Sequence, residues 1–554
     1  MKPSYFLIIV VTFHAFVSAA GSGNIKGRVT DDNGPIVGAI VRIQATETHT
    51  LTDDNGYFTL SKSSENNLPT IVTAWASGYY INGVETISNS EVEIRLKKHT
   101  NTDNPHYTWL PSTLQSGQNE KQACANCHSN ANTDIPFTLP VDEWLEDAHS
   151  QSATNPRFLT MYNGTDMEGN QSPLTKYGYS KEYGSFPLRP DSDQPYYGPG
   201  YKLDFPETNG NCAACHAPLA AVNDPYGVDP TKLSGVHMEG ISCDFCHKIW
   251  DVRLDPVSGL PFDNMPGVLS YELRRPPDGH QFFAGPLDDV ATGEDTYSPL
   301  QTESAICAPC HYSKFWDTPI YNSFGEWLAS PYRNPETGQT CQDCHMPRLG
   351  VTQFATTEAG GIEREPSTIF SHKMPGADAE YLLQNAVTMN VEAHKENDKI
   401  FVEVEIINDK TGHHVPTDSP LRHMILLVQV TDENGGKLKQ VDGPIVPEWG
   451  GIGNPHKGYY AGLAGKGFAK ILMELWTEVS PTGAYWNPTR IVSDNRIPAM
   501  GSDNSTYIFQ ISGDTGTLEV FVQLIFRRAF VELMDQKGWD NADILMEDKR
   551  FILP

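Results

Sequence analysis

Cys124-Ala-Asn-Cys127-His128 is the first of five stretches that decide the architecture of this chain. The others are Cys212-Ala-Ala-Cys215-His216, Cys243-Asp-Phe-Cys246-His247, Cys307-Ala-Pro-Cys310-His311 and Cys341-Gln-Asp-Cys344-His345, and together the five use all 10 cysteines. Each stretch has the C-x-x-C-H pattern of covalent haem attachment. Its two thiols would bond the two vinyl groups of one porphyrin. Its histidine would bind the iron as the proximal ligand, and axial ligation sets the redox potential.

Two other uses of paired cysteines are zinc binding and thiol–disulfide exchange. Neither requires a histidine directly after each pair. Histidine occupies only 18 of the 554 positions, yet it follows all five pairs. The pattern therefore predicts five c-type haems and their iron as the cofactors.

The N-terminus has the features of a secretory signal peptide. Lys2 precedes an apolar stretch from Tyr5 to Val17, and small residues at Ser18 and Ala19 offer a cleavage site. A membrane anchor is the weaker interpretation, because the apolar run is shorter than about 20 residues and contains His14. We therefore predict a signal peptide over residues 1–20, export to the periplasm or the extracellular space, and no membrane span after cleavage.

The chain is strongly acidic. Its 40 Lys+Arg against 69 Asp+Glu give a net charge of −29. Phosphate binding needs a basic surface, so nucleic acid is excluded as an expected partner. A surface of this kind keeps a protein soluble and can also steer basic partners or cations.

The segment over residues 24–98 has no cysteine and is expected to be a β-sandwich. Short alternating segments are separated by turn residues at Asn33-Gly34 and Asn55-Gly56. A second set of spaced residues stands out in this segment: Gly27 to Val29, then Asp31, Gly34, Pro35, Gly38, Ala39 and Val41, then Thr52, Gly56, Tyr57 and Phe58. By the identity and spacing of these residues, the segment resembles the carboxypeptidase regulatory-like domain. The resemblance implies a non-catalytic module for adhesion, docking or folding support, and no H-e-x-x-H peptidase motif is present.

Residues 100–376 hold all five motifs, and we expect a loop-rich, mainly α multihaem core. Short helices are predicted at 141–148, at each C-x-x-C-H and at 323–330. The close spacing of His216 with His247 and of His311 with His345 suggests two locally packed haem pairs. Residues 377–554 have no cysteine and alternate like strands at 400–407, 424–430, 507–511 and 518–526. A C-terminal β-sandwich-like domain is therefore predicted, with helical pieces at 468–475 and 530–537.

Some histidines outside the motifs are expected to be the sixth ligands of the irons, because ligation by two histidines suits electron transfer. The predicted distal ligands are His149, His237, His280, His372 and His413, with His414 and His423 as substitutes for His413. A structural role is the better interpretation for His49, His99, His394 and His456. Met238, Met346 and Met374 are weaker ligand candidates, since methionine more often packs against a ring.

A second resemblance rests on the runs 235–248, 327–332 and 341–347, and on Ser371-His372, 412–417 and 494–498. These stretches resemble bacterial and archaeal multihaem cytochromes, in particular the broad group related to the tetrahaem cytochrome of the hydroxylamine pathway. The resemblance implies electron transfer, often in respiration that ends outside the cytoplasm. It also implies that the Gly-His-x-x-Pro-Thr step places His413 beside a haem, although Asp418 stands where that group has glycine and His414 is a rival.

Three functions remain open from the sequence. The favoured one is an electron carrier that serves redox partner proteins or an extracellular electron acceptor. The second is an oxidoreductase that acts on a small nitrogen or sulfur compound at one five-coordinate haem. The pentahaem nitrite reductases are the obvious comparison for such an enzyme. Their catalytic haem typically has lysine in place of the motif histidine, and no C-x-x-C-K occurs here. The third is a homo-oligomer or cytochrome filament, in which one subunit supplies a haem ligand to the next.

Overall fold

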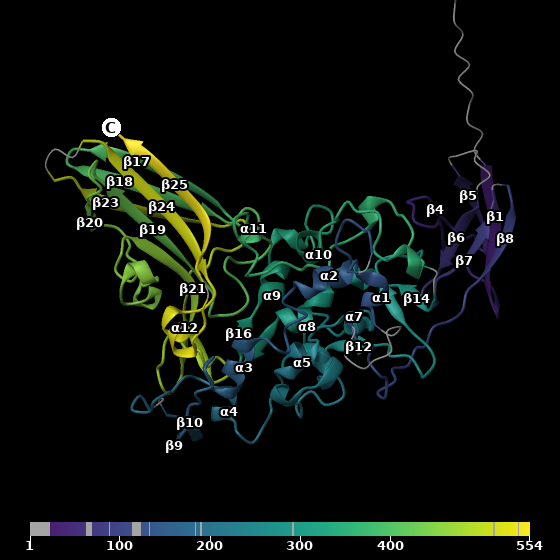
Figure 1. Ribbon diagram of the computed structural model, residues 1–554, viewed down its shortest axis with the longest axis horizontal. Helices are drawn as coiled ribbons and strands as arrows, with labels where there is room; N and C mark the ends of the chain where they lie inside the picture. The colour runs from purple at the N-terminus through teal and green to yellow at the C-terminus, as the bar shows by residue number, and fades with distance from the viewer. Residues whose placement is uncertain are drawn as a thin grey trace, which may run out of the picture. The chain divides into compact units, whose positions relative to one another are not determined.

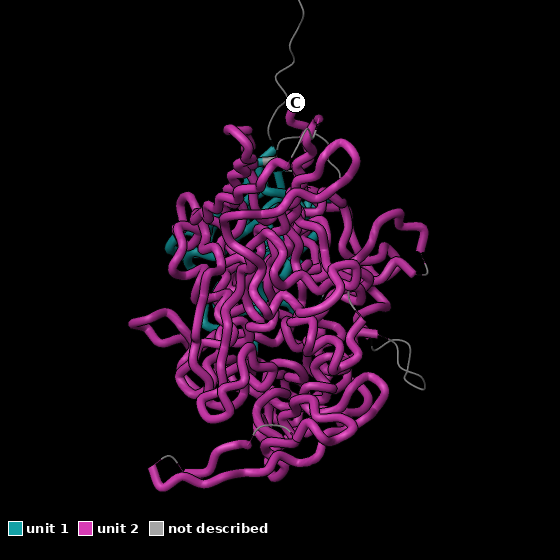
Figure 2. Tube along the Cα trace, turned by 90° about the vertical axis from the view of Figure 1, so that its left-hand side faces the viewer, with its two compact units in different colours: residues 1–99, 287–297 teal, residues 100–286, 298–554 magenta. Residues whose placement is uncertain are grey.

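The computed structural model describes residues 23–62, 69–87, 89–113, 123–131, 133–182, 184–188, 191–290, 293–512, 516–540 and 542–554. The predicted signal peptide lies outside these ranges. The chain forms two compact units, residues 1–99 with 287–297 and residues 100–286 with 298–554 (Figure 2). In the part of the chain that is described, no helix is both long enough and apolar enough to cross a membrane.

The first unit contains two four-stranded sheets around one apolar core. One sheet has the order β2-β1-β5, with β8 also on β1, and the other has the order β4-β3-β6-β7. Alternation along the first strand places Ile25 and Val29 in the core and Lys26 in solvent. The strands are β1 Gly23–Asp31, β2 Gly34–Pro35, β3 Ile40–Ile43, β4 His49–Leu51, β5 Tyr57–Lys62, β6 Thr70–Trp75, β7 Asn82–Thr86 and β8 Glu91–Arg95. The predicted N-terminal β-domain is confirmed.

Residues 287–297 belong to this first unit although they come from the middle of the sequence. Asp288 accepts two hydrogen bonds from the Arg42 guanidinium, at 2.5 and 2.8 Å. Asp289 accepts a bond from the backbone N–H of Ala45 at 2.7 Å. The segment ends in β14, Asp295–Tyr297, where the Trp75 indole donates to the Thr296 hydroxyl at 2.9 Å. A charged pair and a half-buried indole therefore tie the segment to the N-terminal sheets.

The motif-bearing part of the second unit consists of loops, short helices and two-stranded ladders, and Figure 1 shows its small helices between long connections. The longest of its helices, α3, has 8 residues. The expectation of a mainly α core is therefore not supported, whereas loops and a helical turn at each motif are present. The physical reason is that each C-x-x-C-H needs only one turn, and prolines and glycines interrupt any longer helix.

The helices of this part are α1 Ala125–His128, α2 Pro140–Leu145, α3 Pro156–Asn163, α4 Tyr201–Asp204, α5 Ala213–His216, α6 Pro218–Ala221, α7 Cys243–Cys246, α8 Ala308–His311, α9 Ser323–Leu328, α10 Cys341–His345 and α11 Glu380–Leu383. Its strands are β9 Tyr177–Ser180, β10 Gly184–Pro187, β11 Ile249–Val252, β12 Tyr271–Leu273, β13 Phe283–Gly285, β15 Ser313–Phe315 and β16 Thr318–Tyr321. Single 3₁₀ turns, including η3 at Gly235–Met238, connect them.

The C-terminal part of the second unit is β-rich, as predicted. One sheet has the order β17-β18-β23-β20 and the other has the order β22-β21-β19-β24-β25, and both are seen in Figure 1. Their facing sides share one cluster of buried residues, with Val402, Leu426 and Val522 at 0% exposure. The elements are β17 Thr388–Glu396, β18 Lys399–Ile407, β19 His423–Thr431, β20 Lys439–Asp442, β21 Gly465–Glu474, β22 Thr489–Asp494, β23 Ser502–Gln510, β24 Leu518–Arg527, α12 Val531–Lys537 and β25 Ile544–Leu553.

The predicted helix at 530–537 is confirmed as α12, but the helix predicted at 468–475 is wrong. Those residues lie in β21, which pairs with β19 on one side and β22 on the other. Almost every residue of β21 is buried, so its sequence lacks the alternation of a half-exposed strand. A short continuous apolar run of this kind does not distinguish a buried strand from a buried helix.

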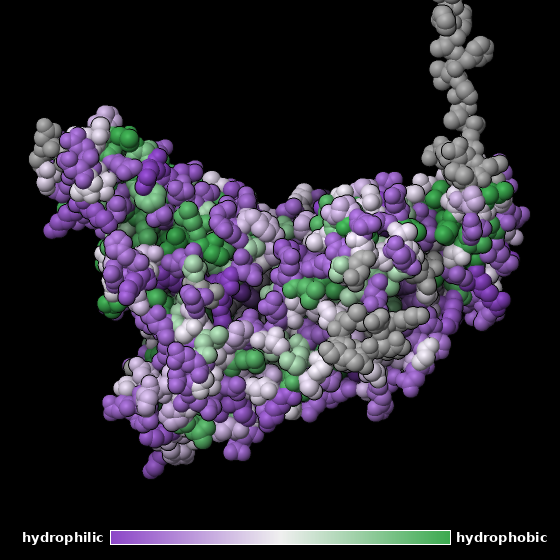
Figure 3. Space-filling view, viewed as in Figure 1, coloured by the Kyte–Doolittle hydropathy of each residue, from purple (hydrophilic) through white to green (hydrophobic). Residues whose placement is uncertain are grey.

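Hydrophilic residues cover most of the face drawn in Figure 3. Apolar residues occur there as separate patches. This surface agrees with the acidic composition of the chain.

Candidate haem sites

Each C-x-x-C-H motif forms one helical turn. In three of them the backbone N–H of the histidine donates to the carbonyl of the first cysteine, at 2.9 Å for His128, 3.0 Å for His216 and 3.0 Å for His247. Residues three and four positions apart lie on the same side of a helix. Both thiols and the imidazole of a motif therefore project from one face, as attachment to one planar ring requires.

Four of the five motif histidines have the Nδ1 atom engaged by a backbone carbonyl. The distances are 2.8 Å from His128 to Phe354, 3.3 Å from His216 to Ser152, 2.8 Å from His247 to Ala284 and 2.7 Å from His345 to Pro375. A carbonyl can only accept, so Nδ1 carries the proton. The lone pair is then on Nε2, which is the arrangement of a metal-binding imidazole held by an outer partner.

Burial also keeps these rings in the neutral form that binds metal. It lowers the pKa of His216 and of His345 to about 4, and it lowers the pKa of His128 and His247 below the usual value. The four rings are therefore neutral at pH 7. Their chemistry fits an iron ligand.

His311 is the exception, because its outer partner is a carboxylate. Its Nδ1 lies 3.9 Å from Oδ1 of Asp418. Burial lowers the pKa of His311, but the nearby carboxylate of Asp418 outweighs burial and raises it to about 9. A carboxylate partner makes an imidazole more basic and a stronger ligand. Asp418 is the residue that departs from the glycine of the resembling group, and the sequence alone did not identify it as a partner of His311.

Two of the predicted distal histidines lie opposite a motif histidine. The ring centroids are 6.2 Å apart for His149 and His311 and 6.4 Å apart for His345 and His413. Two imidazoles that bind one metal from opposite sides, each through a nitrogen about 2 Å away, hold their centroids roughly 6 Å apart. These two pairs therefore have the spacing of rings that share one iron.

The second nitrogen of each distal ring is also occupied. Nδ1 of His149 lies 2.7 Å from Oδ1 of Asp147, and Nδ1 of His413 lies 2.9 Å from the carbonyl of His414. Each ring thus keeps Nε2 for a metal. The geometry fits haem ligation by His149 and His413.

His372 lies near two motif histidines. Its Nδ1 is 3.2 Å from the Phe370 carbonyl. Burial, together with the charges of His247 and His128, lowers its pKa to about 4. The His372 ring is therefore close enough to be a candidate distal ligand for the iron at either the first or the third motif.

The remaining distal candidates have different surroundings. His237 is half-buried in η3, and His280 is exposed at the end of a turn, so both assignments stay predictions. His414 has Nδ1 3.7 Å from Oε1 of Glu326. His423 is fully buried and stacks on Phe530 with centroids 4.8 Å apart, which is the environment of a core histidine. His413 is thus better placed than either substitute.

Contacts between cysteines of different motifs show how the motifs pack. The thiols of Cys124 and Cys243 interact, and this interaction raises the pKa of the first and lowers that of the second. A similar contact joins Cys307 to Cys341 and lowers the pKa of Cys341 to about 7. Another contact, between Cys215 and Cys310, lowers the pKa of Cys310 to about 7. The fourth motif therefore contacts both the second and the fifth, while the third contacts the first.

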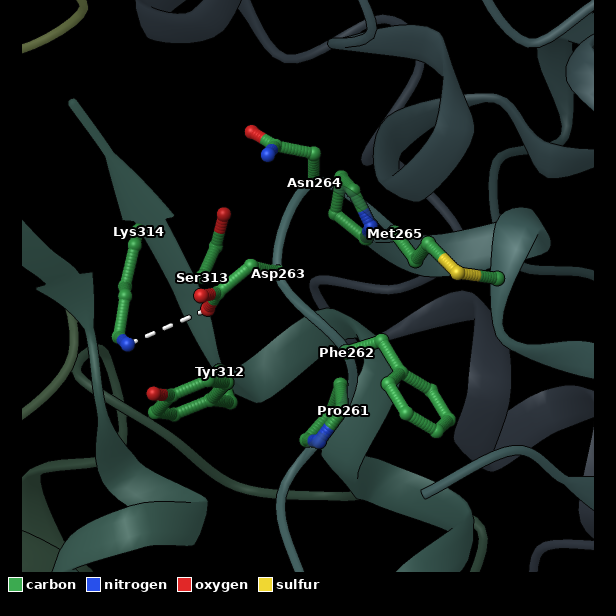
Figure 4. A pocket seen from close by; sticks show the side chains of 9 residues that line it. Pro261, Phe262, Asp263, Asn264, Met265, Tyr312, Ser313 and Lys314 are labelled. Atoms are coloured by element: carbon green, nitrogen blue, oxygen red, sulfur yellow. Dashed lines mark ion pairs between the residues drawn. The ribbon is translucent and has the colours of Figure 1, made fainter. Parts of the chain in front are cut away.

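A small pocket lies beside the fourth motif and contains no predicted ligand. It is lined by residues 261–266 and 312–314 (Figure 4). Lys314 and Asp263 form an ion pair across it at 3.2 Å. The pocket is therefore separate from the predicted iron ligands.

Sequence reasoning also missed a buried polar network next to His413. Glu326 on α9 accepts from Arg496 Nη1 at 2.7 Å, from the Thr417 hydroxyl at 2.5 Å and from the backbone N–H of His414 at 3.2 Å. Arg496 also bonds Asp494 at 2.7 Å. The residues come from segments far apart in the sequence, and no local motif links them.

Comparison with known proteins finds one similar domain family and one similar fold. Residues 25–104 match the model of the CarboxypepD_reg-like domain. The fold is similar to the crystal structure of a penta-heme cytochrome c552 from Thermochromatium tepidum, with a TM-score of 0.51 and 18% identity over 78% of this chain and 97% of that chain. A cohesin–X-dockerin complex from Acetivibrio cellulolyticus is also similar at 18% identity, but it covers 14% of this chain and 58% of its own at a TM-score of 0.13. No curated protein matches the chain. The chain thus contains a CarboxypepD_reg-like domain, and over 78% of its length its fold is similar to that of the penta-heme cytochrome.

Proposed function

We propose that this protein is a c-type cytochrome that binds five haems covalently and transfers electrons. The observation that carries the proposal is that all 10 cysteines lie in five C-x-x-C-H motifs within one compact unit. Contacts between thiols of different motifs support a close arrangement of the haems. The similarity of the fold to that of a penta-heme cytochrome supports the proposal of five haems.

The chain would hold each haem by its two motif cysteines and by its motif histidine. When bound, the irons supply one-electron chemistry. His149 and His413 would fill the position opposite His311 and His345. Two imidazoles on one iron leave no open position for a substrate. Electron transfer is therefore favoured over substrate chemistry at the fourth and fifth motifs.

The cellular setting is part of the proposal. The predicted signal peptide supports export to the periplasm or beyond. The acidic composition favours basic redox partner proteins that are steered by charge, and an extracellular electron acceptor is the other option. The resemblance to the group of the hydroxylamine-pathway tetrahaem cytochrome supports a respiratory role.

Electron paramagnetic resonance and near-infrared magnetic circular dichroism of the ferric holoprotein test this role. We expect low-spin signals from irons with two histidine ligands. A high-spin signal that shifts with nitrite, hydroxylamine or sulfite would contradict a simple electron carrier and support the oxidoreductase alternative. Filaments in single-particle images would instead support the assembly alternative.

A further inference from the structure

The predicted iron site at the fourth motif has a carboxylate behind each of its two imidazoles. Nδ1 of His149 lies 2.7 Å from Oδ1 of Asp147, which also accepts the backbone N–H of His149 at 2.6 Å. Nδ1 of His311 lies 3.9 Å from Oδ1 of Asp418. The centroids of the two rings are 6.2 Å apart. Negative charge therefore lies on the outer side of both rings.

The outer partners at the fifth motif are neutral. Nδ1 of His345 lies 2.7 Å from the Pro375 carbonyl, and Nδ1 of His413 lies 2.9 Å from the carbonyl of the next residue. Glu326 also binds the loop that carries His413, but this carboxylate lies 2.7 Å from Arg496, which balances its charge. The fourth and fifth sites thus offer the same type of ligand but differ in the charge behind it.

Asp418 has an uncommon backbone conformation. Its φ is +69°, in the left-handed region that residues other than glycine adopt only rarely. Glycine would adopt this conformation without strain. Within the described part of the chain, the buried Oδ1 atom of Asp418 has no hydrogen-bond partner, so it is available to the ring N–H of His311. The strained position therefore keeps a carboxylate beside the motif histidine.

The two carboxylates are not equally compensated by cations. The side chain of Asp147 is 2% exposed, and among the described residues no lysine or arginine forms an ion pair with it. Arg422 lies 3.6 Å from Oδ2 of Asp418, and Lys470 attracts the same carboxylate. Buried charges are screened little by salt. We therefore expect both aspartates to act on the site and Asp147 to act more strongly.

The charge of an outer partner affects the oxidation state of a bound iron. Ferric iron carries one more positive charge than ferrous iron, so a nearby negative charge stabilises the ferric form more. A carboxylate also makes the imidazole more basic, which has the same effect. Axial ligands and their outer partners are among the features that set a haem potential. An iron at the fourth motif should therefore be harder to reduce than one at the fifth.

The fourth and fifth motifs adjoin, because the backbone N–H of Cys341 donates at 3.0 Å to the hydroxyl of Ser304, three residues before Cys307. We propose that Asp147 and Asp418 keep the reduction potential of the fourth haem below that of the fifth, so that an electron passes from the fourth to the fifth. One iron is oxidised from ferrous to ferric and the other is reduced, and no bond forms or breaks. This inference rests on the proposed function and makes the two aspartates positioning residues.

The test is a redox titration of the purified holoprotein at pH 7, followed by electron paramagnetic resonance. The signal lost in His149→Ala marks the fourth haem, and the signal lost in His413→Ala marks the fifth. The variants Asp147→Asn and Asp418→Asn keep the shape of the side chain and remove its charge, and asparagine tolerates the left-handed backbone. The matched control is Asp317→Asn, at an exposed aspartate whose φ is +64°.

In the wild type we expect the fourth haem to have the lower midpoint. Loss of an outer partner changes metal binding by about tenfold or more. If the ferric form bears this loss, Asp147→Asn raises the fourth midpoint by about 59 mV, the equivalent of tenfold for one electron. Asp418→Asn should raise it by less, and Asp317→Asn should leave it unchanged. The proposal is overturned if the fourth midpoint is not below the fifth, or if either of the first two variants leaves it in place.

Peptide mass spectrometry of the same samples separates this inference from the proposed function. Covalent haem on the peptides with Cys307 and Cys341, together with equal midpoints of the two haems, refutes the potential difference and leaves the cytochrome standing. Absence of haem from these peptides refutes the five-haem proposal and this inference with it.

Discussion

The carboxylate of Glu326 is expected to hold the loop that carries His413 in place. Its side chain is 2% exposed, and that of its partner Arg496 is 5% exposed. The same carboxylate accepts from Thr417 and from the backbone of His414, the residue after the predicted ligand. Glu326→Gln keeps the shape of the side chain and removes its charge, so the change isolates the electrostatic contribution.

The expected loss of stability follows from these contacts. Removal of one member of a buried ion pair costs about 3–5 kcal/mol. Arg496 retains Asp494 through bonds of 2.8 and 2.7 Å, so we expect the lower end, about 3 kcal/mol. A loss of that size lowers the unfolding temperature of a unit of more than 400 residues by on the order of 3 °C, because the unfolding entropy grows with size.

Differential scanning calorimetry of the holoprotein measures this shift. The control Glu392→Gln, at an exposed position of β17, should change stability by no more than about 0.5 kcal/mol. A loss below about 1 kcal/mol for Glu326→Gln would show that the pair does not act as a buried ion pair. It would refute the supporting role assigned to Glu326.

His149→Ala and His413→Ala should each convert one low-spin haem to a high-spin haem in the electron paramagnetic resonance spectrum. The control His423→Ala should convert none. Unchanged spectra for the first two variants would rule out His149 and His413 as ligands. Asp288→Asn should destabilise the first unit by about 1–3 kcal/mol through loss of the charged bonds to the sheet domain, seen as faster hydrogen exchange in residues 23–62, and unaltered exchange would contradict this. The Asn33 backbone N–H, assisted by Tyr79, lowers the pKa of Asp31 from 3.8 to about 2. The ionised Asp31 carboxylate therefore stabilises the first unit above pH 3.8, and this stabilisation is lost as the pH falls through 2. Asp31→Asn should then flatten the pH dependence of hydrogen exchange in the first unit over that window. An equally steep dependence in the variant would contradict the role of Asp31.

Local patterns predicted a large part of this structure. The spacing within C-x-x-C-H predicted a helical turn at each motif, because one turn brings both thiols and the imidazole to one face. Alternation predicted five of the N-terminal strands, β1, β3, β5, β6 and β8, and four of the C-terminal ones, β18, β19, β23 and β24. His149 and His413 were chosen from their sequence context, and the structure brings each ring to a motif histidine.

Other features depend on contacts that no local pattern records. β21 was mistaken for a helix because its residues are buried on both faces. Asp418 reaches His311 across more than a hundred residues of sequence. The pairing of the second motif with the fourth, through Cys215 and Cys310, likewise depends on tertiary packing and not on spacing along the chain.

The haem content of the intact protein tests the central claim most directly. The chain would be produced with a c-type maturation system, and its haem-to-protein ratio would be measured by the pyridine haemochrome assay and by denaturing mass spectrometry. We predict five haems per chain, each on a peptide that contains one C-x-x-C-H motif. A protein with its cysteines in disulfides or bound to zinc, or one with fewer than five covalent haems after complete maturation, would contradict the claim.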